Sequence, residues 1–254
     1  MKKTLTIALA AAAALVSAQA FAANTATPLN FTSDSQVVPT MANVAGQNGA
    51  MFQTHVSIMN PTNNTFAVTV SFYDGEGMKR SADINLKPGE LKVYENFLDS
   101  IFKYTGAGAA RFTAAETSGG GHNNRFVVSA EVWTPSAAGR FGTTVPVEEF
   151  AASSANSFAA GITVGATART NVGCFNQASA ENAIKANVFD GTGKKLDTVD
   201  FSLPANAWGQ KGVNVAVTGG YVEFVKSDAA LCWAVVVDNA SNDGRFVQAA
   251  EYAP

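Results

Sequence analysis

The sequence is poor in charged residues, histidine and cysteine, and each shortage excludes a class of function. Only 15% of the 254 residues are charged, with 17 Lys and Arg against 20 Asp and Glu, which is too little basic charge to bind a nucleic-acid backbone by counterion release. Two histidines and two cysteines leave almost no ligands for a zinc or haem site. The 47% of hydrophobic residues suffices for a core and argues against disorder. We therefore expect a globular protein with no cofactor, no metal and no nucleic-acid partner.

Residues 1–22 have the pattern of a secretory signal peptide. A Lys-Lys start precedes an alanine-rich apolar stretch over residues 5–16, and a small-residue A-x-A cleavage pattern ends at Ala22. This stretch is too short to span a bilayer, and no later apolar run is long enough to do so. We expect cleavage after Ala22, no transmembrane segment in the mature chain, and a location in the periplasm, at the cell surface or outside the cell.

Cys174 and Cys232 are the only cysteines, and both lie in the second half of the chain. In an oxidising compartment the pair is expected to form a disulfide, with two separate buried thiols as the alternative. The bridge would close a long loop and stabilise the fold by about 4 kcal/mol in the chain-entropy model. A catalytic thiol is not expected, because His55 and His122 both lie in the first half.

Four blocks of sequence recur in the same order, which indicates a duplication. The matching pairs of blocks are residues 54–60 and 170–176, 73–77 and 189–193, 108–112 and 220–224, and 139–141 and 244–246. Pro88 matches Pro204 at the offset of the first two blocks. We therefore expect a first domain over residues 23–150 and a second over residues 151–254, with an Ala- and Ser-rich boundary at 151–157.

Each copy contains short stretches with the period-two alternation of strands. Residues 67–73 alternate, and the Asp-Gly-Glu-Gly sequence that follows supplies hairpin chemistry. The spacing predicts an all-β fold of two tandem antiparallel sandwiches. Four apolar residues at helical spacing within residues 95–104 predict a short helix in the first sandwich. The other predicted strands are residues 56–59, 82–86, 91–94, 109–114 and 126–133, and in the second copy 172–175, 183–189, 197–203, 209–215, 221–226 and 231–237.

A set of short motifs covers most of the mature chain. They are VVP at residues 37–39, AGQNG at 45–49, NP at 60–61, LKPGE at 86–90, RTNVG at 169–173 and VVDN at 236–239. Together they resemble a secreted bacterial β-sandwich repeat family of immunoglobulin-like surface domains, whose function is uncharacterised. Phe52 stands where that pattern has tryptophan, and Cys174 where an aliphatic residue is common. The resemblance implies a fold and an exported setting, and confers no activity.

The sequence holds no established catalytic motif, since G-x-S-x-G, H-E-x-x-H, Walker and Cys-x-x-Cys patterns are all absent. His55 is interpreted as a polar strand residue, because its counterpart in the second copy is Asn171. Glu148 and Glu149 are neighbours on an extended chain and should point to opposite faces. Carboxylates in the turns at residues 74–76, 190 and 238–243 leave calcium binding open, although none fits the EF-hand pattern. We expect no catalytic residues and no enzyme.

Trp133, Trp208 and Trp233 are the candidate ligand-facing residues, because an indole ring offers a flat surface to a sugar. Within residues 231–237, Trp233 shares one strand face with Leu231, whereas Cys232 belongs to the other. If Cys232 points into the core, Trp233 faces the other copy or a ligand. The expected function is an exported, non-enzymatic structural or adhesion-type protein, whose partners are other surface proteins, the protein itself or a polysaccharide.

Two alternatives stay open at this point. One is a glycan-binding module that uses the tryptophans. The other is a subunit of an extracellular filament in which residues 23–38 donate a strand to a neighbouring subunit. Against strand donation, the same segment can pack on its own domain as a first strand.

Overall fold

The computed structural model describes residues 34–114, 124–137, 139–149 and 153–251. Contacts divide the chain into Met1–Asn30 and a compact unit, Phe31–Pro254. Three parts of the sequence discussed above lie outside the described residues: the signal peptide, His122, and the first residues of the predicted boundary at 151–157.

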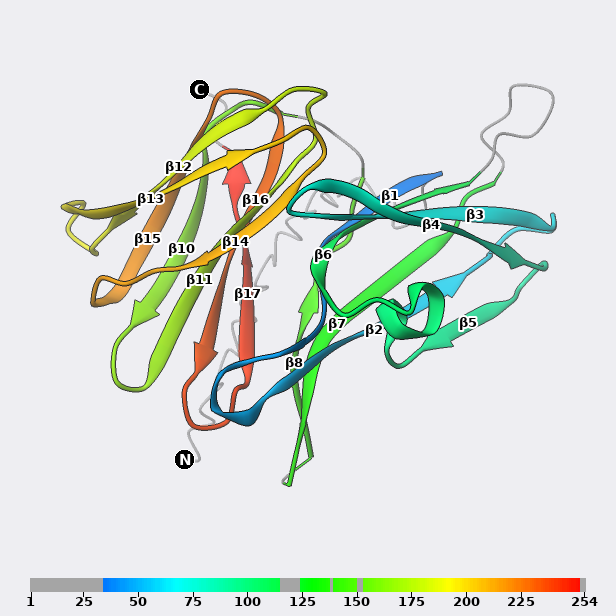
Figure 1. Ribbon diagram of the computed structural model, residues 1–254, viewed down its shortest axis with the longest axis horizontal. Coiled ribbons are helices and arrows are strands. Elements are labelled where there is room, and N and C mark those ends of the chain that lie inside the picture. Colours follow the sequence, from blue (N-terminus) through cyan, green and yellow to red (C-terminus); the bar gives the residue numbers. More distant parts are fainter. Residues whose placement is uncertain (1–33, 115–123, 138, 150–152, 252–254) are drawn as a thin grey trace, which may run out of the picture. The chain divides into compact units, whose positions relative to one another are not determined.

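The described chain is all-β, with 67% strand and 4% helix, as the alternation predicted. Its strands form three antiparallel sheets (Figure 1). The helix expected over residues 95–104 is a single turn at Leu98–Phe102, and a second short turn covers Gln47–Gly49. Among the described residues, no helix has the length and apolar character needed to cross a membrane.

The nine strands of the first half form one folded-over sheet. Its order is β4-β3-β6-β1-β2-β7-β8, with β5 beside β2 and β9 beside β1. Residues 35–43 of β1 pair with β6, and residues 43–45 at its end pair with β2. Strand β1 therefore connects two layers of the sheet. We call them the β3 layer (β4-β3-β6-β1-β9) and the β2 layer (β5-β2-β7-β8). The bounds are β1 Ser35–Ala45, β2 Met51–Met59, β3 Phe66–Asp74, β4 Gly77–Leu86, β5 Leu91–Tyr94, β6 Gly106–Ala114, β7 Val127–Ser136, β8 Gly139–Val145 and β9 Glu148–Glu149.

The second half repeats this order in two separate sheets. The β12 layer runs β13-β12-β15-β10-β18, and the β11 layer runs β14-β11-β16-β17. Each strand therefore has one counterpart in the first half. The bounds are β10 Ser157–Val164, β11 Ala168–Asn176, β12 Asn182–Phe189, β13 Lys195–Leu203, β14 Trp208–Gly212, β15 Val217–Lys226, β16 Ala230–Asp238, β17 Gly244–Gln248 and β18 Ala250–Glu251.

The strand order differs from that of an immunoglobulin domain. In the immunoglobulin constant fold the first strand pairs with the second, and the sixth pairs with the seventh. In this chain β1 pairs mainly with β6, and β7 pairs with β2; likewise β10 pairs with β15, and β16 with β11. The result is sandwich-like, with a connectivity of its own.

Each half buries its own core between its two layers. Val68, Val70 and Phe72, which the alternation placed on one face of a strand, are all fully buried in the first core. Val37 and Val38 lie on β1 within their own sheet, as expected for a segment that packs on its own domain; residues 23–33 are not described.

Two buried asparagines show the repeat at the level of single hydrogen bonds. Asn60 Nδ2 donates to the carbonyls of residues 64, 86 and 87, and Asn176 Nδ2 donates to those of residues 180, 203 and 204. In both, Oδ1 accepts the backbone N–H two residues later. The register thus makes Lys87, rather than Pro88, the counterpart of Pro204, because the second copy has one more residue between these points.

Candidate functional site

The two halves meet through a cluster of aromatic side chains. The fully buried Trp233 stacks with Trp208 and Phe246 at ring-centroid distances of 6.5 and 6.1 Å. Phe175 packs on Tyr73 of the first half at 5.4 Å. Strands β14 and β11 of the second half thereby contact β3, β6 and β1 of the first. The remaining members of the cluster are Val37, Ala109, Leu231 and Val235.

Strand alternation explains why this interface forms. On β16, Cys232 and Ala234 point into the second core, whereas Trp233 and Val235 point to the first half. The expectation that Trp233 and Cys232 point to opposite faces of the strand is therefore confirmed, and Trp233 contacts the first half of the chain. Because its ring is fully buried, Trp233 has no free face for a ligand.

Two hydrogen bonds also connect the halves at the same interface. The Gly142 N–H donates to Asp243 Oδ1 at 3.2 Å, and the Phe246 N–H donates to Thr143 Oγ1 at 3.0 Å. The first bond joins β8 to the residue just before β17, and the second joins β8 to β17 itself. They fix the register of the two halves as well as their contact.

Cys174 and Cys232 form the predicted disulfide. The two residues are directly opposite each other on β11 and β16, with Cα atoms 4.1 Å apart, and both are buried in the second core. The immunoglobulin disulfide instead joins the two sheets of its sandwich. In this protein the bridge fastens two strands of one sheet, the sheet whose other face carries the aromatic cluster.

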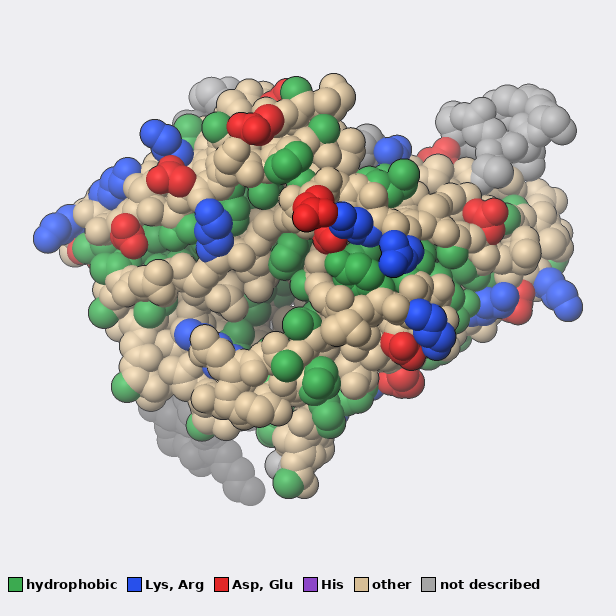
Figure 2. Space-filling view, in the orientation of Figure 1, with side chains coloured by type: hydrophobic (Ala, Val, Ile, Leu, Met, Phe, Trp, Pro, Cys, Tyr) green, Lys and Arg blue, Asp and Glu red, His purple; other side chains and the backbone are tan. Residues whose placement is uncertain are grey.

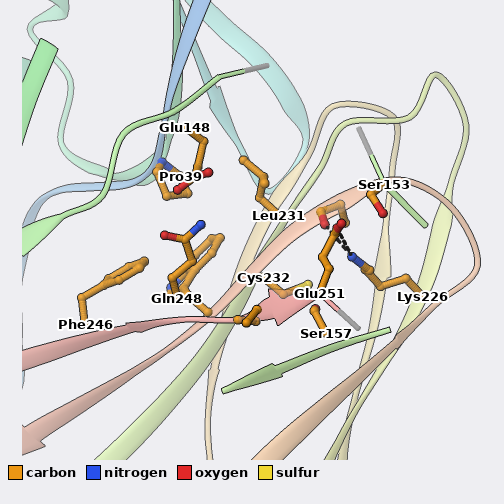
Figure 3. A pocket seen from close by; sticks show the side chains of 14 residues that line it. Pro39, Glu148, Ser153, Ser157, Lys226, Leu231, Cys232, Phe246, Gln248 and Glu251 are labelled. Carbon is orange, nitrogen blue, oxygen red and sulfur yellow. Dashed lines mark hydrogen bonds and ion pairs between the residues drawn. The ribbon is translucent and has the colours of Figure 1, made fainter. Parts of the chain in front are cut away.

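A pocket of about 270 Å³ opens beside this cluster (Figure 3). Pro39 and Glu148 of the first half line it together with residues of the second half. Lys226 Nζ donates to the Ala230 carbonyl at 3.1 Å and lies 3.3 Å from Glu251 Oε1, and only 1% of its side chain is exposed. Burial lowers the pKa of Lys226, and Glu251 offsets part of that effect.

Two further polar side chains face the same pocket. Ser157 Oγ is buried without a hydrogen-bond partner in the described part of the chain, and Gln248 lies between Phe246 and Glu251 in Figure 3. Glu251 balances the charge of Lys226, and Glu148 adds a second carboxylate to the lining, so the pocket suits a small polar molecule without negative charge.

A line of three polar side chains lies on the outer face of the β2 layer. His55 Nε2 is 3.1 Å from Ser57 Oγ, and His55 Nδ1 is 3.3 Å from Glu95 Oε2. The contact with His55, followed by the contact with Arg140, holds the pKa of Glu95 below its usual value. This is the order of a serine–histidine–acid triad. Sequence reasoning missed it, although period-two alternation alone puts Ser57 and His55 on one face.

The line lacks other parts that acyl-transfer catalysis needs. β2 lies between β5 and β7, so its backbone N–H groups serve the sheet ladder and are not free to stabilise an oxyanion. Ser57 sits on an open sheet face directly opposite Val93, which is 50% exposed. The arrangement is therefore better explained as a polar network on a sheet surface.

The remaining tryptophans do not form a shared platform. The guanidinium of Arg140 covers the ring of Trp133 at 4.1 Å from the ring centroid. Glu131 and Glu95 hold that guanidinium at 2.8 and 3.0 Å. Trp208 is part of the interface between the halves, so the structure separates it from Trp133.

The turn carboxylates accept hydrogen bonds from their own backbones. Asp74 Oδ1 accepts the Glu76 N–H at 2.9 Å. Its counterpart Asp190 accepts the hydroxyl and N–H of Thr192, and these bonds lower the pKa of Asp190. Within the described ranges, no group of three or more His, Cys, Asp or Glu residues is placed to hold a metal ion.

Exposed apolar side chains gather on the outer face of the β2 layer. Met59, Leu91 and Val93 are 39%, 57% and 50% exposed, and Met59 lies directly opposite Leu91. Charged side chains of both signs are interspersed over the face of the molecule seen in Figure 2. We call the β2–β5 surface around Met59, Leu91 and Val93 the apolar face.

Comparison of the chain with family models, curated proteins and solved structures found no match. The features that bear on function are therefore those of this chain: the apolar face, the pocket beside Lys226 and the aromatic interface between the halves.

Proposed function

We propose that the protein is an exported, non-enzymatic structural or adhesion-type module built from two β-sandwiches. They are immunoglobulin-like in the broad sense of paired antiparallel layers. The observation that carries the proposal is the apolar face, where Met59, Leu91 and Val93 adjoin on one sheet surface. Contiguous exposed apolar surface of this kind marks interaction sites in soluble proteins.

Two features support export of the chain. The N-terminal 22 residues have the charge, length and cleavage pattern of a signal peptide. The Cys174–Cys232 disulfide belongs to proteins of oxidising compartments. Both fit a protein of the periplasm, the cell surface or the extracellular space.

Adhesion and turnover can be measured on the same preparations. Beads coated with the purified protein are scored for adhesion to protein-coated and polysaccharide-coated surfaces, and the free protein is assayed on ester, peptide and glycoside substrates. We expect adhesion that falls at least about tenfold in Val93→Asp, because the buried charge removes a central contact. Met78→Asp is the matched control, since Met78 is exposed on β4, away from the apolar face. Hydrolysis that disappears in Ser57→Ala would overturn the proposal.

Glycan binding is a second candidate, and the pocket beside Lys226 favours it. Its lining includes Phe246, and its polar groups include Ser157 and Gln248, a combination that suits a neutral sugar. A glycan array is the test, with Gln248→Ala as the variant. Binding that this substitution weakens supports the pocket, and an array without signal eliminates it.

A further inference from the structure

The apolar face has a counterpart in the second half, and this counterpart packs against the first half within the same molecule. On β11 and β14, Phe175 lies opposite Trp208, as Met59 lies opposite Leu91 on β2 and β5. On the neighbouring strand, Leu231 faces Phe175 as Val127 faces Met59. The outer face of the β11 layer, which packs on the first half, is therefore the repeat equivalent of the apolar face.

The receiving side of the internal interface also has a counterpart. It is the outer face of the β3 layer, which contributes Val37, Tyr73 and Ala109. Their equivalents by register are Phe158, Phe189 and Tyr221 on the β12 layer. These three are half-buried and alternate with residues of the second core.

The equivalent face of the β12 layer is rich in aromatic surface. Phe189 and Tyr221 stack face to face, with ring centroids 4.8 Å apart and an interplanar angle of 7°. Phe158 lies on adjacent β10, opposite Glu223. We call the surface of Phe158, Phe189 and Tyr221 the aromatic face.

We propose that the apolar face of one molecule docks on the aromatic face of a second copy. This contact would repeat between molecules the contact that the two halves make within one molecule. The inference rests on the proposed function and names the partner as the chain itself. Because the two faces differ, the contact is heterologous and leaves a free face at each end of a dimer, so association continues head to tail.

Differences between the faces set the strength of the contact. Trp233 and Val235 lie on the outer face of the β11 layer, which packs on the first half. By register they correspond to Ser129 and Glu131 on the outer face of the β2 layer. Less apolar area is therefore buried between molecules than between the halves. We expect reversible, concentration-dependent association that is weaker than the internal interface.

The test uses one variant for each face. Val93→Asp blocks the apolar face and Tyr221→Asp blocks the aromatic face, and sedimentation velocity measures the species present. The purified protein should show a series of oligomers that grows with concentration, and each variant alone should stay monomeric. An equimolar mixture of the two variants should form dimers and nothing larger, because only one intact face of each kind remains. Met78→Asp should assemble like the unmodified protein.

Several results would overturn the inference. They are a monomer at every concentration, a mixture without dimers, or a Val93→Asp variant that still forms long oligomers. If either variant loses its cooperative melting transition, Leu91→Lys and Phe158→Lys replace them at the same faces. A persistent monomer refutes self-docking alone, whereas Ser57-dependent turnover refutes the proposed function, so the two failures are distinguishable.

Discussion

Gly173 lies directly opposite Trp233 across the β11–β16 ladder, and the indole occupies the space where any other residue would place its Cβ atom. An ideal Cβ at Gly173 would approach Trp233 Cζ2 to 2.5 Å. The ring can therefore lie flat on the sheet and face the first half only because position 173 has no side chain. The interface between the halves depends on this pair.

Gly173→Ala should destabilise the protein, because Trp233 is packed on both sides and has no room to retreat. We expect a loss of about 1–3 kcal/mol in the free energy of unfolding, typical of overpacking. Urea denaturation followed by tryptophan fluorescence measures it. Gly165→Ala is the control, since a Cβ there meets nothing within 4 Å. Equal stabilities for the two variants would contradict the packing argument.

Replacing Cys174 and Cys232 together by alanine should lower the free energy of unfolding by about 4 kcal/mol, because the bridge restricts a loop with a sequence separation of 58. Denaturation with and without reductant checks this value. Reductant should destabilise the unmodified protein and leave the double variant unchanged. A reductant effect that persists in the double variant would mean that the stabilisation has another source.

The burial of Lys226 predicts a pH dependence of stability. Burial lowers the lysine pKa in the folded protein, so at pH values between the folded pKa and the ordinary value the unfolded chain binds more protons. Stability from this group therefore rises with pH in that window. Relative to Lys226→Met, the unmodified protein should gain stability as the pH rises toward the ordinary lysine pKa. A constant difference between the two proteins over that range would refute the assignment.

Asn60→Ala and Asn176→Ala should be similarly destabilising. Each removes a fully buried amide that donates to three carbonyl oxygens, and buried acceptors left unpaired cost about 1–3 kcal/mol each. We expect a loss of about 3 kcal/mol for each variant in chemical denaturation. Asn85→Ala, at an exposed position of β4, should change stability by less than about 0.5 kcal/mol. A large difference between the two buried positions would contradict their equivalence.

The alternation of apolar and polar residues predicted which side chains of a single strand face the core. Alternation located Val68, Val70 and Phe72 in the core, and it placed Trp233 opposite Cys232. The blocks of the duplication lie on corresponding strands, but their residue matches fail where the loops differ in length. Gly244 pairs with Val237 as Gly142 pairs with Trp133, so by register the counterpart of Gly244 is Gly142 rather than Gly139.

Features built from segments that are distant along the chain could not be predicted from the sequence. The line from Ser57 through His55 needs Glu95, which follows β5, and the pocket is lined by Glu148 of the first half together with Lys226 of the second. No spacing along the chain encodes such meetings, because they depend on how layers stack. The apolar face was missed for the same reason, since Leu91 and Met59 look like ordinary strand residues until the register of β2 and β5 is known.

The central claim is that the apolar face of one molecule docks on the aromatic face of another. Cross-linking mass spectrometry on a mixture of isotopically heavy and light protein tests it most directly. Lys92 lies on β5 beside the apolar face, and the exposed Lys185 lies on β12, the strand that carries Phe189. Self-docking predicts heavy–light cross-links between Lys92 and Lys185. Heavy–light links that join only Lys92 to Lys92, or Lys185 to Lys185, would contradict it.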